Sequence, residues 1–179
     1  PADARARVKL HAGDARTFSV TQRFALITAP FRSFQHCTTI DDQLAYIAGA
    51  VRHLAPGGRF IFDCFNPRFE YLTRDRTEET VDTPEFEMPD GRRMRRTSRI
   101  PRVRWADQVN ESELIYYVTP AGSQTAQRYV QAFEMRWVLR DELVHLIARS
   151  GLRITAIYGD FDRSPLVDGA PEIIVVAER

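Results

Sequence analysis

The side chains best suited to chemistry in this sequence follow two short apolar runs. His36 comes after the first run, in the segment Phe31-Arg-Ser-Phe-Gln-His36. An imidazole can accept a proton near neutral pH, so His36 is a candidate general base. A histidine at the entry to a helix can instead bond only to backbone. The sequence leaves both interpretations of His36 open.

A second group of polar side chains follows the other run, Arg59-Phe-Ile-Phe-Asp63. If that run is a strand, these side chains lie at its carboxyl end, where open α/β sheets bind ligands. We therefore predict a substrate-binding role, although Asn66-Pro67 is equally typical of a turn. The candidates are Asp63, Asn66, Arg68 and Tyr71.

Asp14 has a comparable position near the start of the chain. Residues 8–12 alternate in polarity, which predicts a short strand that ends at Gly13-Asp14. The carboxylate could accept hydrogen bonds from a ligand, or it could form an Asx turn or cap a helix. We favour the ligand-binding interpretation.

Strands and helices alternate in the segments that would position these residues. Phe24-Ala-Leu-Ile-Thr-Ala29 is continuously apolar, which predicts a strand covered on both faces. Thr39 and Asp42 resemble a capping box at the start of a helix, and Pro56-Gly57-Gly58 ends that helix before the strand at residues 59–63. This order implies parallel strands with right-handed crossovers. The predicted apolar stripe of the helix is Leu44, Ile47, Ala48, Val51 and Leu54.

The middle of the chain, residues 84–138, changes period. Turn signals at Asp90-Gly91 and Pro120-Ala-Gly122 predict an antiparallel meander with strands at residues 86–88, 93–104, 108–118 and 127–138. Its aromatic side chains could roof a pocket, but at strand spacing they more often pack a sheet onto its neighbour. These residues are Tyr116, Tyr117, Tyr129, Phe133 and Trp137.

Arginines cluster in the same region. They could form a phosphate-binding strip, which would suit an anionic cosubstrate such as a nucleotide-sugar. Nearby acids favour the simpler interpretation of a solvated hairpin face. The cluster is Arg92, Arg93, Arg95, Arg96, Arg99, Arg102 and Arg104, and the acids are Glu85, Glu87, Asp107, Glu111 and Glu113.

The last stretch returns to an α/β pattern. Asp141-Glu142 begin a helix that Gly151 ends, and strands are predicted at residues 152–158 and 171–177. The acids between these strands lack the spacing of a calcium loop, so we expect no metal site. The chain has 179 residues, a net charge of +1 and no apolar run of membrane length. We therefore expect a cytoplasmic protein that binds neither nucleic acid nor membrane.

Four segments, taken in order, resemble class I S-adenosylmethionine-dependent methyltransferases. Gly13-Asp14-Ala15-Arg16 stands where that family has its "GDA" segment, and residues 24–36 look like its fourth strand and following loop. Residues 54–63 are similar to its "L-x-P-G-G" turn and fifth strand. Residues 151–162 resemble the end of its last helix and its reversed final strand pair. The order of the segments is more specific than any one of them.

The resemblance implies roles for individual residues. Asp14 would accept from the adenine amino group, with the Ala15 N–H facing a ring nitrogen and Arg16 beside it. The loop that ends at His36 looks most like that of aminosugar N-methyltransferases, in which a histidine lies near the acceptor amine. The methionine end of the cofactor would be walled by Thr28, Ala29, Pro30 and Phe31.

The sequence departs from the family at its front. None of its nine glycines forms G-x-G-x-G or G-x-G-x-x-G. The family's strands that carry this loop lie between its third and fourth strands, so the resemblance implies an unpaired edge on the strand at residues 24–29. We expect the third strand to pair there, or a homodimer through that edge or the insertion, or a separate N-terminal piece. This chain alone could be inactive and unable to bind the cofactor.

The predicted fold is therefore α/β: part of a Rossmann-like class I methyltransferase sheet with a reversed terminal strand and an antiparallel β insertion. Residues 1–83 and 139–179 would form the core, and residues 84–138 the insertion. The predicted reaction is methyl transfer from S-adenosylmethionine to a small-molecule acceptor, an amine. Two alternatives stay open: a non-catalytic module that binds a partner or dimerises, and another nucleotide-binding enzyme such as a dehydrogenase.

Overall fold

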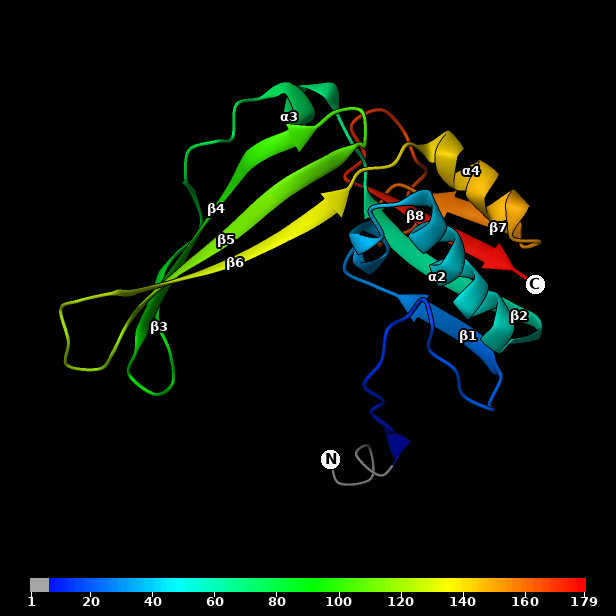
Figure 1. Cartoon of the computed structure of the whole chain (residues 1–179), viewed down its shortest axis with the longest axis horizontal. Coiled ribbons are helices and arrows are strands. Elements are labelled where there is room, and N and C mark those ends of the chain that lie inside the picture. Colours follow the sequence, from blue (N-terminus) through cyan, green and yellow to red (C-terminus); the bar gives the residue numbers. More distant parts are fainter. Residues whose placement is uncertain (1–6) are drawn as a thin grey trace.

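The computed structural model describes residues 7–179 and contains two four-stranded sheets (Figure 1). The body sheet has the order β1-β2-β8-β7. β1 and β2 are parallel, whereas β8 runs antiparallel to both of its neighbours. The predicted α/β fold with a reversed strand is confirmed, and the antiparallel direction of β8 argues against the dehydrogenase alternative. The strands are β1 (Phe24–Ala29), β2 (Leu54–Phe65), β7 (Arg153–Tyr158) and β8 (Glu172–Glu178).

Helices α2 (Ile40–His53) and α4 (Arg140–Arg149) lie over the body sheet and share its core (Figure 1). Thr39 caps α2 as predicted, because its side chain accepts from the Asp42 N–H at 3.1 Å. The buried stripe differs from the prediction, since Ala48 is exposed and Ala50 is buried. No helix in the described part of the chain is long and apolar enough to span a membrane. The largest core side chains are Phe34, Ile47, Leu54, Phe60, Phe62, Leu143, Ile147 and Ile173.

The irregular first part of β2 requires two glycines. Gly57 has a φ of 70°, a conformation that L side chains rarely adopt. A Cβ on Gly58 would come within 2.9 Å of the Phe24 carbonyl oxygen. Leu54 pairs with Phe24, and regular pairing resumes where Arg59 meets Leu26, so β2 begins before the predicted strand at residues 59–63.

The second sheet, which we call the arm sheet, is antiparallel, has the order β3-β4-β5-β6 and extends away from the body sheet (Figure 1). β4 has its predicted bounds, whereas β3 begins well before the predicted residue 86. A short helix, α3 (Phe69–Thr73), leads from β2 towards it. The strands are β3 (Thr80–Glu87), β4 (Arg93–Arg104), β5 (Val109–Thr119) and β6 (Gln127–Arg136).

The arginine cluster of the arm sheet is neutralised by neighbouring acids. For example, Arg99 pairs with Glu113 at 2.6 Å, across β4 and β5. Arg95 instead lies over the Tyr117 ring at 4.1 Å. The hairpin-face interpretation therefore describes this cluster better than a phosphate-binding strip. The remaining pairs are Arg92–Asp90, Arg93–Glu85, Arg96–Asp82, Arg102–Glu111, and Arg104 with Asp107, Glu111 and Glu134.

The prediction for the N-terminal segment was wrong in two respects. Residues 8–12 do not form a strand, and Leu10 is 92% exposed. A strand needs a partner for its N–H and C=O groups, and no described strand runs beside this segment. β1 was expected to be covered on both faces, but it lies at the edge of the body sheet with Leu26 54% exposed. Its outer edge is unpaired within residues 7–179.

Candidate functional site

Residues 30–36, here called the β1 loop, leave the carboxyl end of β1 beside the carboxyl end of β2. Phe31 and Arg32 both have positive φ, at 59° and 58°. Such a conformation costs about 1–3 kcal/mol for a residue other than glycine, so the surroundings must hold it. The buried Asp63, near the end of β2, does so by accepting from the Arg32 N–H at 2.9 Å.

The Arg32 side chain ties the β1 loop to β8 as well. Its guanidinium forms an ion pair with Glu172, with Nε 3.3 Å from Oε2. The carboxylate raises the pKa of Arg32 above its ordinary value, mainly through these hydrogen bonds. Asp63 and Glu172 therefore fix one residue of the loop from two strands.

Gln35 connects the β1 loop to the arm sheet. The side chain is fully buried, its Oε1 accepts from the Phe65 N–H at 2.9 Å, and its Nε2 donates to the Arg136 carbonyl at 3.0 Å. One amide thus joins the end of β2 to the end of β6. The sequence analysis missed Gln35, because its partners lie 30 and 101 residues away in the chain.

His36 is exposed, and its Nδ1 lies 3.2 Å from the carbonyl oxygen of Glu134 in β6. A carbonyl can only accept, so Nδ1 carries the proton and Nε2 keeps its lone pair. The ring also packs against Phe133, with centroids 5.6 Å apart. No partner of Nε2 lies within the described residues. The histidine therefore bonds to backbone, as one interpretation of the sequence expected, and its role as a general base stays a prediction.

The predicted substrate residues do not gather around His36 as one set. Asp63 braces the β1 loop, and Asn66 donates to the Ala170 carbonyl at 2.9 Å, which braces the segment before β8. Asn66 and Arg68 line a hollow that neither His36 nor Tyr71 lines. Tyr71 lies elsewhere, with its ring 4.3 Å from the Arg76 guanidinium. Their substrate roles stay predictions.

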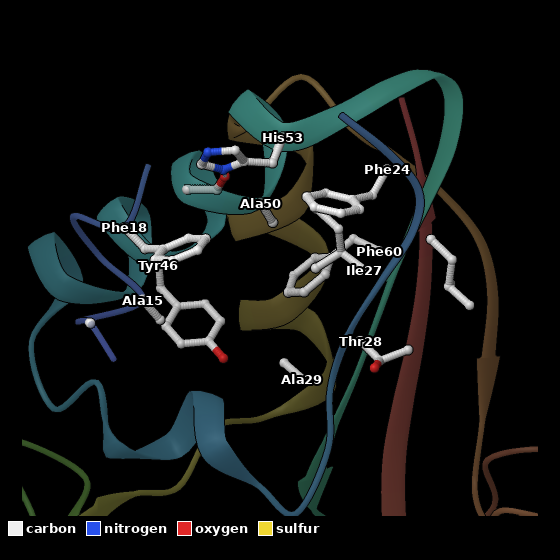
Figure 2. Close-up of a pocket in the computed structure, with 13 residues that line it drawn as sticks. Ala15, Phe18, Phe24, Ile27, Thr28, Ala29, Tyr46, Ala50, His53 and Phe60 are labelled. Carbon is white, nitrogen blue, oxygen red and sulfur yellow. The ribbon is translucent and has the colours of Figure 1, made fainter. Parts of the chain in front are cut away.

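A cavity of about 420 Å³ lies between β1, α2 and residues 13–18 (Figure 2). Figure 2 shows the rings of Phe18 and Tyr46 on one side of the cavity, and the Phe24 ring and the aliphatic side chain of Ile27 on the other. The lining is largely apolar. Of the predicted cofactor residues, Ala15, Thr28 and Ala29 line this cavity, whereas Pro30 and Phe31 do not.

Asp14 lies between two residues that line this cavity, and it is held by Arg16. Its Oδ1 accepts from the Arg16 backbone N–H at 2.9 Å and from Nε at 3.0 Å. These bonds lower the pKa of Asp14 to about 2, so the carboxylate is charged at neutral pH. Arg16 also reaches Asp42 of α2 at 2.5 Å. A carboxylate has further lone pairs, so Asp14 can still accept from a ligand.

His53, at the top of the cavity in Figure 2, differs from His36 in that both of its nitrogens have partners. Its Nδ1 donates to the Gly49 carbonyl at 2.7 Å, and its Nε2 accepts from the Val20 N–H at 3.0 Å. The side chain is buried and holds the segment before β1 against α2. His53 is therefore structural.

No protein-family model matches the chain. In sequence it is 24% identical over 168 residues to the cypemycin N-terminal methyltransferase of a Streptomyces species. The match covers 93% of this chain and 63% of that protein. The chain thus spans less than two thirds of the length of this curated relative.

Two solved structures share the fold across nearly the whole chain. A S-adenosylmethionine-dependent methyltransferase of Clostridium acetobutylicum has a TM-score of 0.77 at 15% identity, and the match covers 99% of this chain and 68% of that one. The S-adenosylmethionine-bound amino pentose methyltransferase of Micromonospora echinaspora, from calicheamicin biosynthesis, has a TM-score of 0.67 at 25% identity, with coverages of 99% and 69%. The resemblance inferred from the sequence is confirmed: this chain has the fold of the class I S-adenosylmethionine-dependent methyltransferases.

Proposed function

We propose that this chain forms the acceptor side of an enzyme that transfers a methyl group from S-adenosylmethionine to an amine of a small molecule. The observation that carries the proposal is the geometry of His36, whose Nδ1–H is held by the Glu134 carbonyl while Nε2 has no partner within residues 7–179. The names of the relatives, an N-terminal and an amino pentose methyltransferase, support an amine as the acceptor.

The chemistry follows from the state of the amine. A protonated amine has no lone pair, so a base must take its proton before a new N–C bond can form. Nε2 of His36 takes this proton, and the Nδ1–H bond to Glu134 persists in the resulting imidazolium. When bound, S-adenosylmethionine would supply a methyl group on a sulfonium sulfur, and this sulfur would become the neutral thioether of the leaving group. The braces on the β1 loop keep the base aligned with the amine.

The residues present fit the adenosine side of the cofactor. Ala15, Phe18 and Ile27 offer an apolar wall for a purine ring, and the charged Asp14 beside them offers an acceptor for its amino group. In the class I fold further strands pair with the strand that β1 represents, and the unpaired edge of β1 fits such a pairing. The proposed cofactor residues are Asp14, Ala15, Arg16, Thr28, Ala29, Pro30 and Phe31.

Calorimetric titration with S-adenosylhomocysteine tests the proposal in this chain and in a version extended by the residues encoded upstream. We expect the extended version to bind and to release S-adenosylhomocysteine when given S-adenosylmethionine and a suitable small amine. If neither version bound the cofactor product, the enzymatic proposal would be refuted in favour of a non-catalytic module.

A further inference from the structure

Two residues that each have a buried polar atom without a partner among the described residues, Arg76 and Asn110, line one small cavity at the base of the arm sheet. The cavity, about 200 Å³ in volume, lies between residues 71–77 and strands β4 and β5. Asn110 is only 4% exposed, and neither its Oδ1 nor Nη1 of Arg76 has a hydrogen-bond partner among the described residues. A buried polar group left unpaired costs about 1–3 kcal/mol, so two in one cavity indicate a place for a polar ligand.

Unlike the arginines of the arm cluster other than Arg95, Arg76 has no counterion among the described residues. Within residues 7–179 no carboxylate lies within ion-pairing distance of it, and its guanidinium stacks on the Tyr71 ring at 4.3 Å. Its own carbonyl accepts from the Ile100 N–H at 2.7 Å, which fixes the backbone at this position. Asp75, which also lines the cavity, accepts instead from the Thr77 N–H and hydroxyl.

The chemistry of the two atoms defines the ligand. A guanidinium has only donors, and it binds carboxylate and phosphate oxygens best. The Asn110 oxygen can only accept, so it needs a hydroxyl or an ammonium group. Trp105 and Pro101 add apolar walls to the cavity. The matching ligand is an oxyanion with a neighbouring hydrogen-bond donor.

The arm sheet places this cavity close to His36. Asn110 and Ser112 point to the same face of β5, about 7 Å apart along the strand. Ser112 is the cross-strand partner of Phe133, whose ring contacts His36. Pro101 lines both the cavity and a neighbouring hollow that Ser112 and Phe133 line. A small molecule with its amine at His36 can therefore extend an anionic group to Arg76.

We propose that the cavity is an oxyanion subsite for the acceptor. The acceptor is then an amine that also carries a carboxylate or phosphate, which Arg76 binds, and a nearby hydroxyl or ammonium, which donates to Asn110. The link to the acceptor rests on the proposed methyl transfer, whereas anion binding by the cavity does not.

Amide and indole NMR signals test the subsite in the full chain without any cofactor. Inorganic phosphate and acetate are titrated at constant ionic strength while the Trp105 indole N–H and the Asn110 amide are followed. We expect a saturable shift of both signals with at least one anion. Phosphate alone would indicate a phosphoryl group on the acceptor, and acetate alone a carboxyl group.

Variants separate a specific site from general charge attraction. Arg76→Gln should weaken the binding at least tenfold, and it keeps the backbone bond to Ile100. Arg153→Gln removes the same charge from an exposed position on β7 and should leave the affinity unchanged. The proposal fails if neither anion gives a saturable shift, or if Arg76→Gln binds as tightly as the wild type.

Turnover gives a second readout that keeps the two proposals apart. If the extended enzyme methylates amines, Arg76→Gln should raise the KM of acceptors that carry an anionic group at least tenfold. The control variant Arg153→Gln should leave this KM unchanged. Anion binding without methyl transfer would refute only the proposed function, whereas methyl transfer without anion binding would refute only the subsite.

Discussion

The two sides of the proposed site are held in very different ways. Residues 32–36 of the β1 loop, on the acceptor side, are joined to β2, β8 and β6 through Asp63, Glu172 and Gln35. On the cofactor side, residues 13–16 contact α2 through the ion pair of Arg16 with Asp42 and through the Ala15 carbonyl, which lies against Gly49. The loop that carries the proposed base is therefore tied to three strands, whereas residues 13–16 make no hydrogen bond to a strand within the described part of the chain.

The largest expected effect concerns His36. In the extended, active enzyme, His36→Ala should lower kcat by about 10²–10⁴-fold, the range that general bases contribute, with little change in affinity for S-adenosylhomocysteine. His36→Gln is the matched control, since an amide can donate to the Glu134 carbonyl but cannot take up a proton. An unchanged kcat in either variant would remove His36 from the mechanism.

A substitution at Gln35 tests whether its two hydrogen bonds stabilise the acceptor side. Gln35→Leu leaves the Phe65 N–H and the Arg136 carbonyl without partners, so the free energy of unfolding should fall by about 2–4 kcal/mol. Urea denaturation measures this change. Gln124→Leu, on an exposed turn, should change the stability by less than about 0.5 kcal/mol. If the two variants were equally stable, Gln35 would not hold the acceptor side in the way described above.

Cysteine labelling compares the two sides directly. Burial raises the pKa of Cys37, directly after the β1 loop, from 9.0 to about 11, which lowers its thiolate fraction at pH 8 about 100-fold. In native protein, iodoacetamide should therefore modify Cys37 at least 100-fold more slowly than a cysteine introduced by Ala15→Cys, at an exposed position on the cofactor side. Mass spectrometry gives both rates, and similar rates would mean that the loop opens freely.

The smallest effect is expected from Asp14. Arg16 lowers the pKa of this carboxyl in the folded state from 3.8 to about 2. A depressed pKa contributes stability above the unfolded-state value, and this contribution is lost as the pH falls from about 4 to 2. Asp14→Asn should thus be slightly less stable than wild type at pH 7, with the difference shrinking below pH 4. Thermal unfolding across this range checks it against Asp168→Asn, an exposed loop carboxylate.

Local signals in the sequence predicted the elements well where the chain itself supplies the partners. The bounds of β1 and β4 match the prediction, and Thr39 caps α2. Gly151 ends α4 with a φ of 80°, as a C-terminal cap should. These features depend on residues within one or two turns of each other, so composition and spacing suffice to find them.

Features that depend on distant pairing could not be predicted. Residues 8–12 have the alternation of a strand but no neighbour to pair with, and periodicity says nothing about neighbours. The burial of β1 was overestimated for the same reason. The tautomer of His36 depends on a carbonyl 98 residues away, whose position follows from the docking of the arm sheet. That polar atoms of Asn110 and Arg76 are buried without partners depends on the folded arm sheet, so the sequence alone could not predict it.

The place of β8 in the body sheet has a consequence for how the molecule is made. β8 is the central partner that joins β2 to β7, although both of these strands leave the ribosome before it. Until it is inserted, β7 has no strand beside it, and one edge of β2 waits unpaired. The body sheet can therefore close only after β8 has been synthesised, through pairing between distant segments. A chain that ended before residue 172 would lack the strand that joins β2 to β7.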